Sequence, residues 1–125
     1  MSTFIAYALV LATVALTVYG QFALKWQVMR SPPMPRGAHA ITSYVVDLLL
    51  TPLVISGLAA AFLASICWML ALTRLPLSHA YPMTSLTLVL VVVGSAWLLG
   101  EPVGGVRMAG VALIAVGIVM IGSQT

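Results

Sequence analysis

The sequence predicts an all-α membrane protein with four transmembrane helices and a short interfacial helix before the second. Hydrophobic residues make up 62% of the 125 residues, and only 6% are charged. A soluble domain carries about 25% charged residues, so this chain has too few to cover a surface that faces water. Several apolar stretches also reach the length of about 20 residues that crossing a hydrocarbon core requires. Residues 1–125 are therefore expected to form a single four-helix transmembrane domain.

Residues that stop helices divide the chain into four apolar spans. Lys25 and Arg30 follow the first span, and a proline-rich break at 31–37 then removes backbone donors that a helix needs. No basic segment precedes the first span, which is therefore interpreted as a retained helix and not as a cleaved signal. The later connections are short, so successive spans are expected to be antiparallel neighbours. The expected spans are 4–24, 51–73, 78–99 and 106–122.

A further apolar segment at 39–50 is too short to cross the membrane. Asp47 lies off its apolar face, so the segment is amphipathic. Such a helix is expected to lie in the membrane interface and to lead into the second span. The residues spaced to share its apolar face are Tyr44, Val45, Leu48 and Leu49.

The distribution of lysine and arginine predicts the orientation in the membrane, because cytoplasmic loops carry an excess of both residues. Lys25, Arg30, Arg36 and Arg107 fall on one side of the membrane, whereas Arg74 falls on the other side with the N-terminal amine. Loops one and three are therefore expected to be cytoplasmic, with both termini outside.

A polar stripe on the first span carries the strongest candidate for a binding site. Thr13, Thr17, Gln21 and Lys25 are each four residues apart, so they lie along one slowly drifting face of a helix. A lysine at a helix centre costs roughly 2.5–3.5 kcal/mol on insertion scales, and less near an end. Lys25 is therefore either an interfacial anchor or a cation that faces a ligand, and the stripe that leads to it favours the ligand.

The other spans offer weaker candidates. Tyr81 and Ser85 share a face of the third span, where Pro82 frees a carbonyl of the preceding turn. Such a hydroxyl-lined wall suits a substrate headgroup, although small polar residues also serve close helix packing. Trp68 lies near the end of the second span, where it is either a substrate contact or an aromatic-belt anchor.

Two charged residues flank the tight turn between the third and fourth spans. Glu101 and Arg107 form either a solvated surface pair, worth at most about 1 kcal/mol, or part of a site in which Glu101 holds Lys25 or Arg107 in place. On the fourth span, Gly110 and Gly117 lie seven residues apart on one face. Small residues at this spacing permit close backbone approach, either at a dimer seam or within the chain, and the seam is favoured slightly.

The sequence does not contain the residue patterns that several classes of function require. There is no paired carboxylate cluster, Ser-His-Asp set, metal-ligand spacing or glycine-rich phosphate loop. Cys67 is the only cysteine, so no disulfide forms within the chain, and the five basic residues are too few for a nucleic-acid interface. No enzymatic activity, cofactor, metal or nucleic-acid partner is expected.

Three runs of the sequence resemble a known group of transporters. Residues 80–86 (AYPMTSL), 100–102 (GEP) and 110–119 (GVALIAVGIV) are similar to the drug/metabolite transporter superfamily, and four spans in this length resemble its small multidrug resistance-like branch. The chain most resembles the paired small subunits of the undecaprenyl-phosphate–aminoarabinose flippase, in which Gly20-Gln21 followed by Lys25 also has a counterpart. The resemblance covers most of the chain except the longer, proline-rich first loop.

This resemblance implies passage of a polyprenyl-phosphate-linked sugar between leaflets of the bacterial inner membrane, by a homo- or heterodimer. The charges agree, since a lipid phosphate needs cations and donors, whereas exporters of cationic drugs rely on a glutamate in the first helix. The first span here contains no acid. The residues expected to contact the substrate are Lys25, Gln21, Thr17, Tyr81, Ser85, Trp68, Arg30, Arg107 and Glu101.

Two other functions remain open. The chain could export small cationic compounds, with proton coupling through Glu101. It could also be a non-transporting accessory subunit of a glycolipid transporter, in which case it would bind no headgroup without its partner chain.

Overall fold

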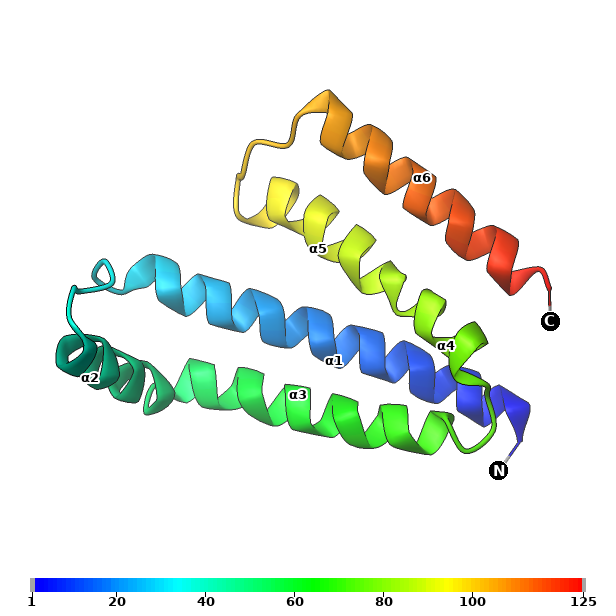
Figure 1. Cartoon of the computed structure of the whole chain (residues 1–125), viewed down its shortest axis with the longest axis horizontal. Helices are drawn as coiled ribbons and strands as arrows, with labels where there is room; N and C mark the ends of the chain where they lie inside the picture. Colours follow the sequence, from blue (N-terminus) through cyan, green and yellow to red (C-terminus); the bar gives the residue numbers. More distant parts are fainter. Residues whose placement is uncertain (1, 125) are drawn as a thin grey trace.

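Six helices joined by short connections make up the computed structural model, which describes residues 2–124 (Figure 1). Four helical stretches in that range are long and apolar enough to cross a membrane: α1, α3, the consecutive pair α4 and α5, and α6. The prediction of four spans with a shorter apolar helix before the second is confirmed, and the chain is a multi-pass membrane protein. The helices are α1 (Thr3–Arg30), α2 (Ala38–Leu49), α3 (Pro52–Ala71), α4 (Leu77–Met83), α5 (Ser85–Leu98) and α6 (Gly105–Gly122).

The four spans lie in an open row and do not form a closed bundle. α3 packs along α1, α5 packs on the other side of α1, and α6 packs on α4 and α5 (Figure 1). Successive spans are therefore neighbours for the first pair and the last pair, as expected. For the second and third spans the expectation is wrong along most of their length, because the connection from α3 carries the chain across to α1. This arrangement leaves broad apolar faces uncovered on α3 and α6.

Small residues bring α1 and α3 into close contact. A Cβ atom on Gly20 would lie 3.0 Å from the carbonyl oxygen of Gly57, and one on Gly57 would lie 3.3 Å from the Cβ of Ala23. Without a hydrophobic driving force between helices in lipid, such close van der Waals packing is what holds two spans together. The α1–α3 pair is therefore the best-packed part of the molecule.

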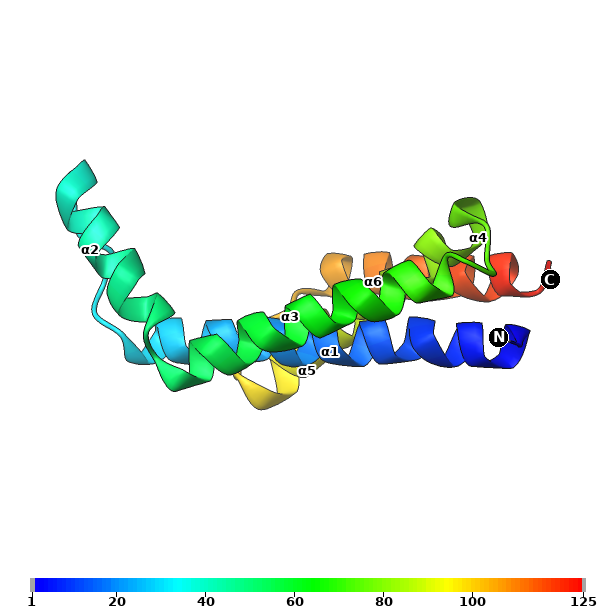
Figure 2. The same cartoon turned by 90° about the horizontal axis from the view of Figure 1, so that it is seen from below.

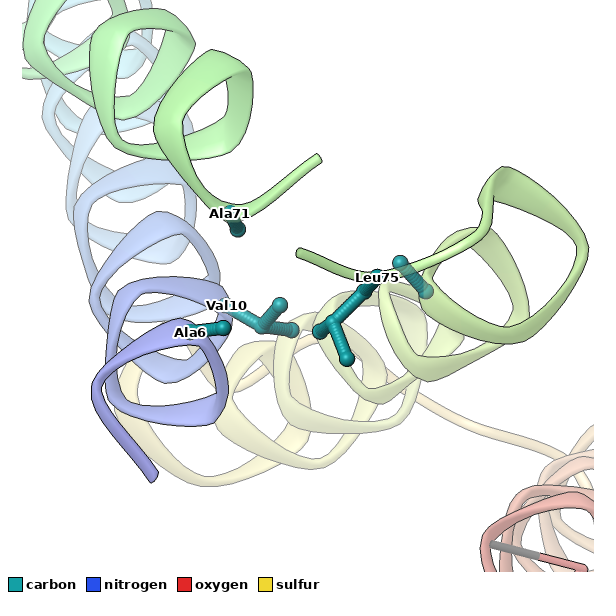
Figure 3. Packing of buried hydrophobic residues seen from close by; sticks show 5 residues of the cluster. Ala6, Val10, Ala71 and Leu75 are labelled. Atoms are coloured by element: carbon teal, nitrogen blue, oxygen red, sulfur yellow. The ribbon is translucent and has the colours of Figure 1, made fainter. Parts of the chain in front are cut away.

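A small buried cluster joins the N-terminal end of α1 to the connection between α3 and α4. Ala6 and Val10 of α1 meet Ala71 and Leu75, and Ala80 completes the cluster (Figure 3). Leu75 and Ala80 thus hold the beginning of the third span over α1. This contact explains why the third span follows α1 instead of α3.

The first helix is longer than the span predicted from apolarity. It contains 28 residues and continues to Arg30, which gives a length of about 42 Å against a hydrocarbon core of about 30 Å. Nothing in 25–30 stops a helix, and the backbone leaves the helical conformation only at Ser31, before the prolines. Lys25 consequently lies inside a helix that extends into the headgroup region.

The third span is interrupted at Thr84. Pro82 lies inside α4, and the N–H groups of Thr84 and Thr87 bond to the carbonyls three residues earlier, at 3.0 and 2.9 Å. These tighter bonds are typical of a 3₁₀ turn and compensate for the donor that proline lacks. The loosened start expected for this span is therefore a break between α4 and α5.

Helix α2 projects away from the spans (Figure 2). None of its residues is buried, and its start depends on Gly37, whose φ of 97° is a left-handed conformation that suits glycine. The Tyr44 hydroxyl donates to the carbonyl of Pro32 at 2.8 Å and anchors the helix to the proline-rich loop. Its exposure and angle agree with the predicted interfacial helix.

Candidate functional site

Three of the predicted site residues lie together around one cavity. Lys25 and Gln21 of α1 face Glu101 in the α5–α6 loop across a space of about 260 Å³. The Nζ atom of Lys25 lies 3.7 Å from Oε1 of Glu101, so Glu101 holds Lys25 and not Arg107. The remaining walls of this Lys25 cavity are Phe22, Val91, Ser95 and Leu99.

A glycine cap positions the carboxylate. α5 ends at Leu98, and the N–H groups of Leu99 and Glu101 both donate to the Ser95 carbonyl, at 3.2 and 3.1 Å. Gly100 between them has a φ of 67°, the left-handed conformation that commonly ends a helix. The turn therefore brings Glu101 back over the end of α5 toward α1.

The ion pair is accessible. The side chains of Lys25 and Glu101 are 51% and 41% exposed. An exposed pair contributes at most about 1 kcal/mol to stability, so a charged ligand can displace it at little cost. The cavity thus presents a cation, a carboxylate, an amide and a hydroxyl to whatever enters.

The N-terminal part of the polar stripe, which contains Thr13 and Thr17, faces α3. Thr17 lines a second cavity of about 300 Å³ between α1 and α3, together with Ser65 and Trp68. Steps of four residues drift by about 40° each around a helix, so Thr13 and Lys25 point in different directions. The Thr13 hydroxyl is already bonded to the Leu9 carbonyl at 2.8 Å. The predicted single stripe therefore serves two cavities.

The hydroxyl wall of the third span is only partly assembled. The rings of Tyr81 and Trp68 make an edge-on contact, with centroids 6.3 Å apart, so Trp68 links the Thr17 cavity to Tyr81. Tyr81 also lines an open groove with Ser78 and Pro82. Ser85 is half-buried beyond the interruption of the span and lines none of the cavities described here.

The two outlying arginines lie apart from the Lys25 cavity. Arg30 lines an apolar groove of about 590 Å³ with Tyr19, Phe22, Trp26 and two smaller residues. Arg107 is exposed on the first turn of α6. Both lie on the Lys25 side of the membrane, because the α1–α2 and α5–α6 loops share that side (Figure 1).

The two glycines of the fourth span face no other part of the described chain. A Cβ atom on Gly110 or Gly117 would meet nothing within 4 Å outside its own surroundings on α6. Packing within residues 2–124 therefore does not explain why positions 110 and 117 are glycines. The neighbouring side chains of Leu113 and Val116 are also largely exposed.

The comparison with known proteins identifies the family. The model of the EamA-like transporter family matches residues 1–123. This chain belongs to the EamA-like transporter family. The predicted resemblance to the drug/metabolite transporters is thereby confirmed, and no solved structure matches the chain.

Three relatives of the chain carry the same name, "Probable 4-amino-4-deoxy-L-arabinose-phosphoundecaprenol flippase subunit ArnF". The chain is 34% identical to that of Pseudomonas fluorescens over 127 residues, which cover 100% of this chain and 93% of the relative. It is 37% identical to that of Erwinia tasmaniensis over 113 residues, 89% of each chain. It is 38% identical to that of Sodalis glossinidius over 120 residues, 92% of this chain and 88% of the relative.

Sequence reasoning missed two contacts of this EamA-like chain. The Tyr7 hydroxyl lies 2.9 Å from Nε2 of His79. Phe22 rests against Gly94 at the α1–α5 contact. Both pairs join residues far apart in the sequence, so no local pattern signals them. Among residues 2–124, no three metal-ligating side chains come together.

Replacing Gly94 with alanine is expected to disturb the Lys25 cavity. The new Cβ would lie 2.5 Å from the Phe22 ring, which forms one wall of the cavity and must move away. Because the contact is with the far end of a side chain that can rotate away, the cost should lie near the lower end of the range of about 1–3 kcal/mol that is typical of overpacked contacts. The melting temperature in detergent should fall, and adding Phe22→Leu should restore most of it. Equal melting temperatures for wild type and Gly94→Ala would contradict this contact.

Proposed function

We propose that this chain is a subunit of a flippase that moves a polyprenyl-phosphate-linked sugar between the leaflets of the bacterial inner membrane. The observation that carries the proposal is the Lys25 cavity, which offers an accessible cation and neutral donors on a helix that reaches from the hydrocarbon core into the headgroup region. The names of its relatives, similar over nearly their whole length, support the same substrate class.

Lys25 is proposed to bind the lipid phosphate. A phosphate entering the membrane loses hydration, and a charge-assisted hydrogen bond to an ammonium group offsets part of that loss. Gln21 and Ser95 then hydrogen-bond the sugar. The prenyl tail stays in lipid, since the open row of helices leaves the cavity accessible from the side.

The remaining predicted residues form the proposed route. Arg30 and Arg107 attract the anionic headgroup to the loading side of the membrane. Thr17, Trp68 and Tyr81 line the way to the opposite side, where their hydroxyls and rings can contact the sugar, and Ser85 joins them when the break at Thr84 moves. If loops one and three are cytoplasmic, as their cations predict, loading begins at the inner leaflet.

A dimer completes the transporter in this proposal. An open row of four helices cannot enclose a sugar headgroup, and the relatives are named as subunits. The α6 face that contains Gly110 and Gly117 is the proposed seam for a second copy or a related subunit, because close backbone approach in lipid requires small residues.

Replacing Gly117 with leucine should therefore dissociate the dimer without unfolding the chain. Nothing in the described chain occupies the space beside Gly117, so the isolated subunit tolerates the side chain. Cross-linking in native membranes should show the dimer in wild type and its loss in Gly117→Leu. Undiminished cross-linking would exclude this face as the seam.

Export of cationic compounds is less well supported. Such a substrate needs an unpaired carboxylate within the membrane, and Glu101 is paired with Lys25 in a loop. The chain has only one other acid, Asp47, on the interfacial α2.

Vesicles test the proposed function. The chain is reconstituted alone and with its co-purified partner, together with a short-chain polyprenyl phosphate that carries an amino sugar. An amine-reactive reagent that cannot cross the bilayer then labels headgroups in the outer leaflet. Flipping predicts that almost all headgroups become labelled, far faster than in protein-free vesicles. Labelling only in the presence of the partner would show that a related subunit, and not a second copy, completes the transporter, and labelling no faster than the lipid control under both conditions would contradict the proposal.

A further inference from the structure

A carboxylate beside the cation is unexpected in a site for a simple anion. Oε1 of Glu101 lies 3.7 Å from Nζ of Lys25, and both groups border the same cavity. A phosphate that approaches Lys25 also approaches the negative charge of Glu101, so attraction and repulsion largely cancel. A ligand that carries only a phosphate therefore gains little from this site.

A ligand with charges of both signs fits the pair better. Its phosphate can bind Lys25 while an ammonium group binds Glu101, so two ion pairs replace one and no charge is left unpaired. Unpaired charge in a poorly hydrated site is what makes binding costly. Both side chains are about half exposed and have flexible stems, which lets the existing pair open around a ligand.

The rest of the cavity supports a polar group between the two charges. Gln21 and Ser95 supply neutral donors and acceptors, whereas the other walls are the apolar side chains of Phe22, Val91 and Leu99. The Gly100 cap fixes the backbone of Glu101 through the Ser95 carbonyl. The backbone of Glu101 therefore has a defined position, from which the flexible side chain can reach one end of a ligand.

We infer that Glu101 is a specificity-determining residue, and that the cavity selects lipid-linked sugar phosphates whose sugar carries an amine. Lys25 recognises the phosphate and Glu101 recognises the ammonium group. This inference rests on the proposed function, but it assigns to the carboxylate a role that phosphate binding alone does not require.

Binding of two matched ligands tests the inference. The full-length chain in lipid nanodiscs, with its partner where one co-purifies, is titrated with a short-chain polyprenyl phosphate that carries either 4-amino-4-deoxy-L-arabinose or L-arabinose. Wild type should bind the amino sugar about tenfold more tightly or better, since one charge-assisted hydrogen bond distinguishes the two ligands. Glu101→Gln should reduce this ratio to about one, whereas Glu101→Asp and the control Asp47→Asn should retain it.

The outcomes separate this inference from the proposed function. If Glu101→Gln keeps the preference for the amino sugar, or if wild type binds both sugars equally, the proposed role of Glu101 is wrong. The flippase proposal would be unaffected by either result. Failure of wild type to bind either sugar phosphate better than the phosphate-free polyprenol would contradict the proposed function itself. If the ion pair is only structural, Glu101→Gln should weaken the binding of both ligands equally and leave the ratio of their affinities unchanged. That result would also contradict the inference.

Discussion

Replacing Lys25 with alanine is expected to abolish movement of the lipid-linked sugar while the chain is still expressed and inserted. The substitution removes the cation proposed to bind the phosphate. A hydrogen bond to a charged group contributes about 1.5–3 kcal/mol, so affinity should fall by roughly ten- to 150-fold. It also leaves the Glu101 carboxylate without its partner and facing the phosphate. Stability should change by no more than about 1 kcal/mol, because the pair is exposed.

The vesicle labelling assay measures this effect, and two variants control it. Arg74→Ala removes an exposed cation from the opposite side of the membrane and should leave transport unchanged. Lys25→Arg keeps the positive charge and should retain part of the activity. If Lys25→Ala transports as fast as wild type, Lys25 is only an interfacial anchor and the proposed site is wrong.

Replacing Gly20 with leucine should produce the largest loss of stability. Even the first atom of the new side chain would lie 3.0 Å from the carbonyl oxygen of Gly57, and backbone cannot yield as a side chain can. Overpacked contacts cost about 1–3 kcal/mol, and here they separate the best-packed pair of helices. The melting temperature in detergent and the yield of folded protein should both fall.

A glycine in open surroundings provides the matched control for this prediction. Gly105 begins α6, and a Cβ atom there meets nothing within 4 Å. Gly105→Leu should therefore melt like wild type. If Gly20→Leu also melted like wild type, the close approach of α1 and α3 would be incorrect.

Composition was enough to predict four spans, but not where their helices end. Apolarity marks the residues that lie in lipid, whereas a helix continues until its backbone is interrupted. The first helix accordingly passes the predicted end at residue 24 and stops only at Arg30, before the proline-rich loop. Pro82 signalled a disturbance in the third span, although the break itself falls at Thr84, where hydrogen bonds to residues three positions earlier take over.

The order of the spans in space could not be derived from short connections. Leu75 and Ala80 pack on Ala6 and Val10, and this contact between distant parts of the sequence places the third span beside α1. The same limit applies to Tyr7 and His79, which are joined by a hydrogen bond across the fold. Local patterns contain no signal for such contacts.

The sequence identified the individual residues of the candidate site but did not show which of them lie together in space. Charge and spacing singled out Lys25, Gln21 and Glu101, which the fold brings together. Helical spacing also suggested that Thr17 belongs with Lys25. The accumulated rotation of about 40° per step instead turns Thr17 toward α3 and Trp68.

A structure of the chain with a short-chain polyprenyl phosphate that carries 4-amino-4-deoxy-L-arabinose would show directly whether Lys25 binds the phosphate. We expect density for the phosphate beside Nζ of Lys25, within the cavity between α1 and the α5–α6 loop, with the prenyl chain leaving into lipid. Headgroup density confined to the Thr17 and Trp68 cavity, or to the outer face of α6, with the Lys25–Glu101 pair still closed, would contradict it.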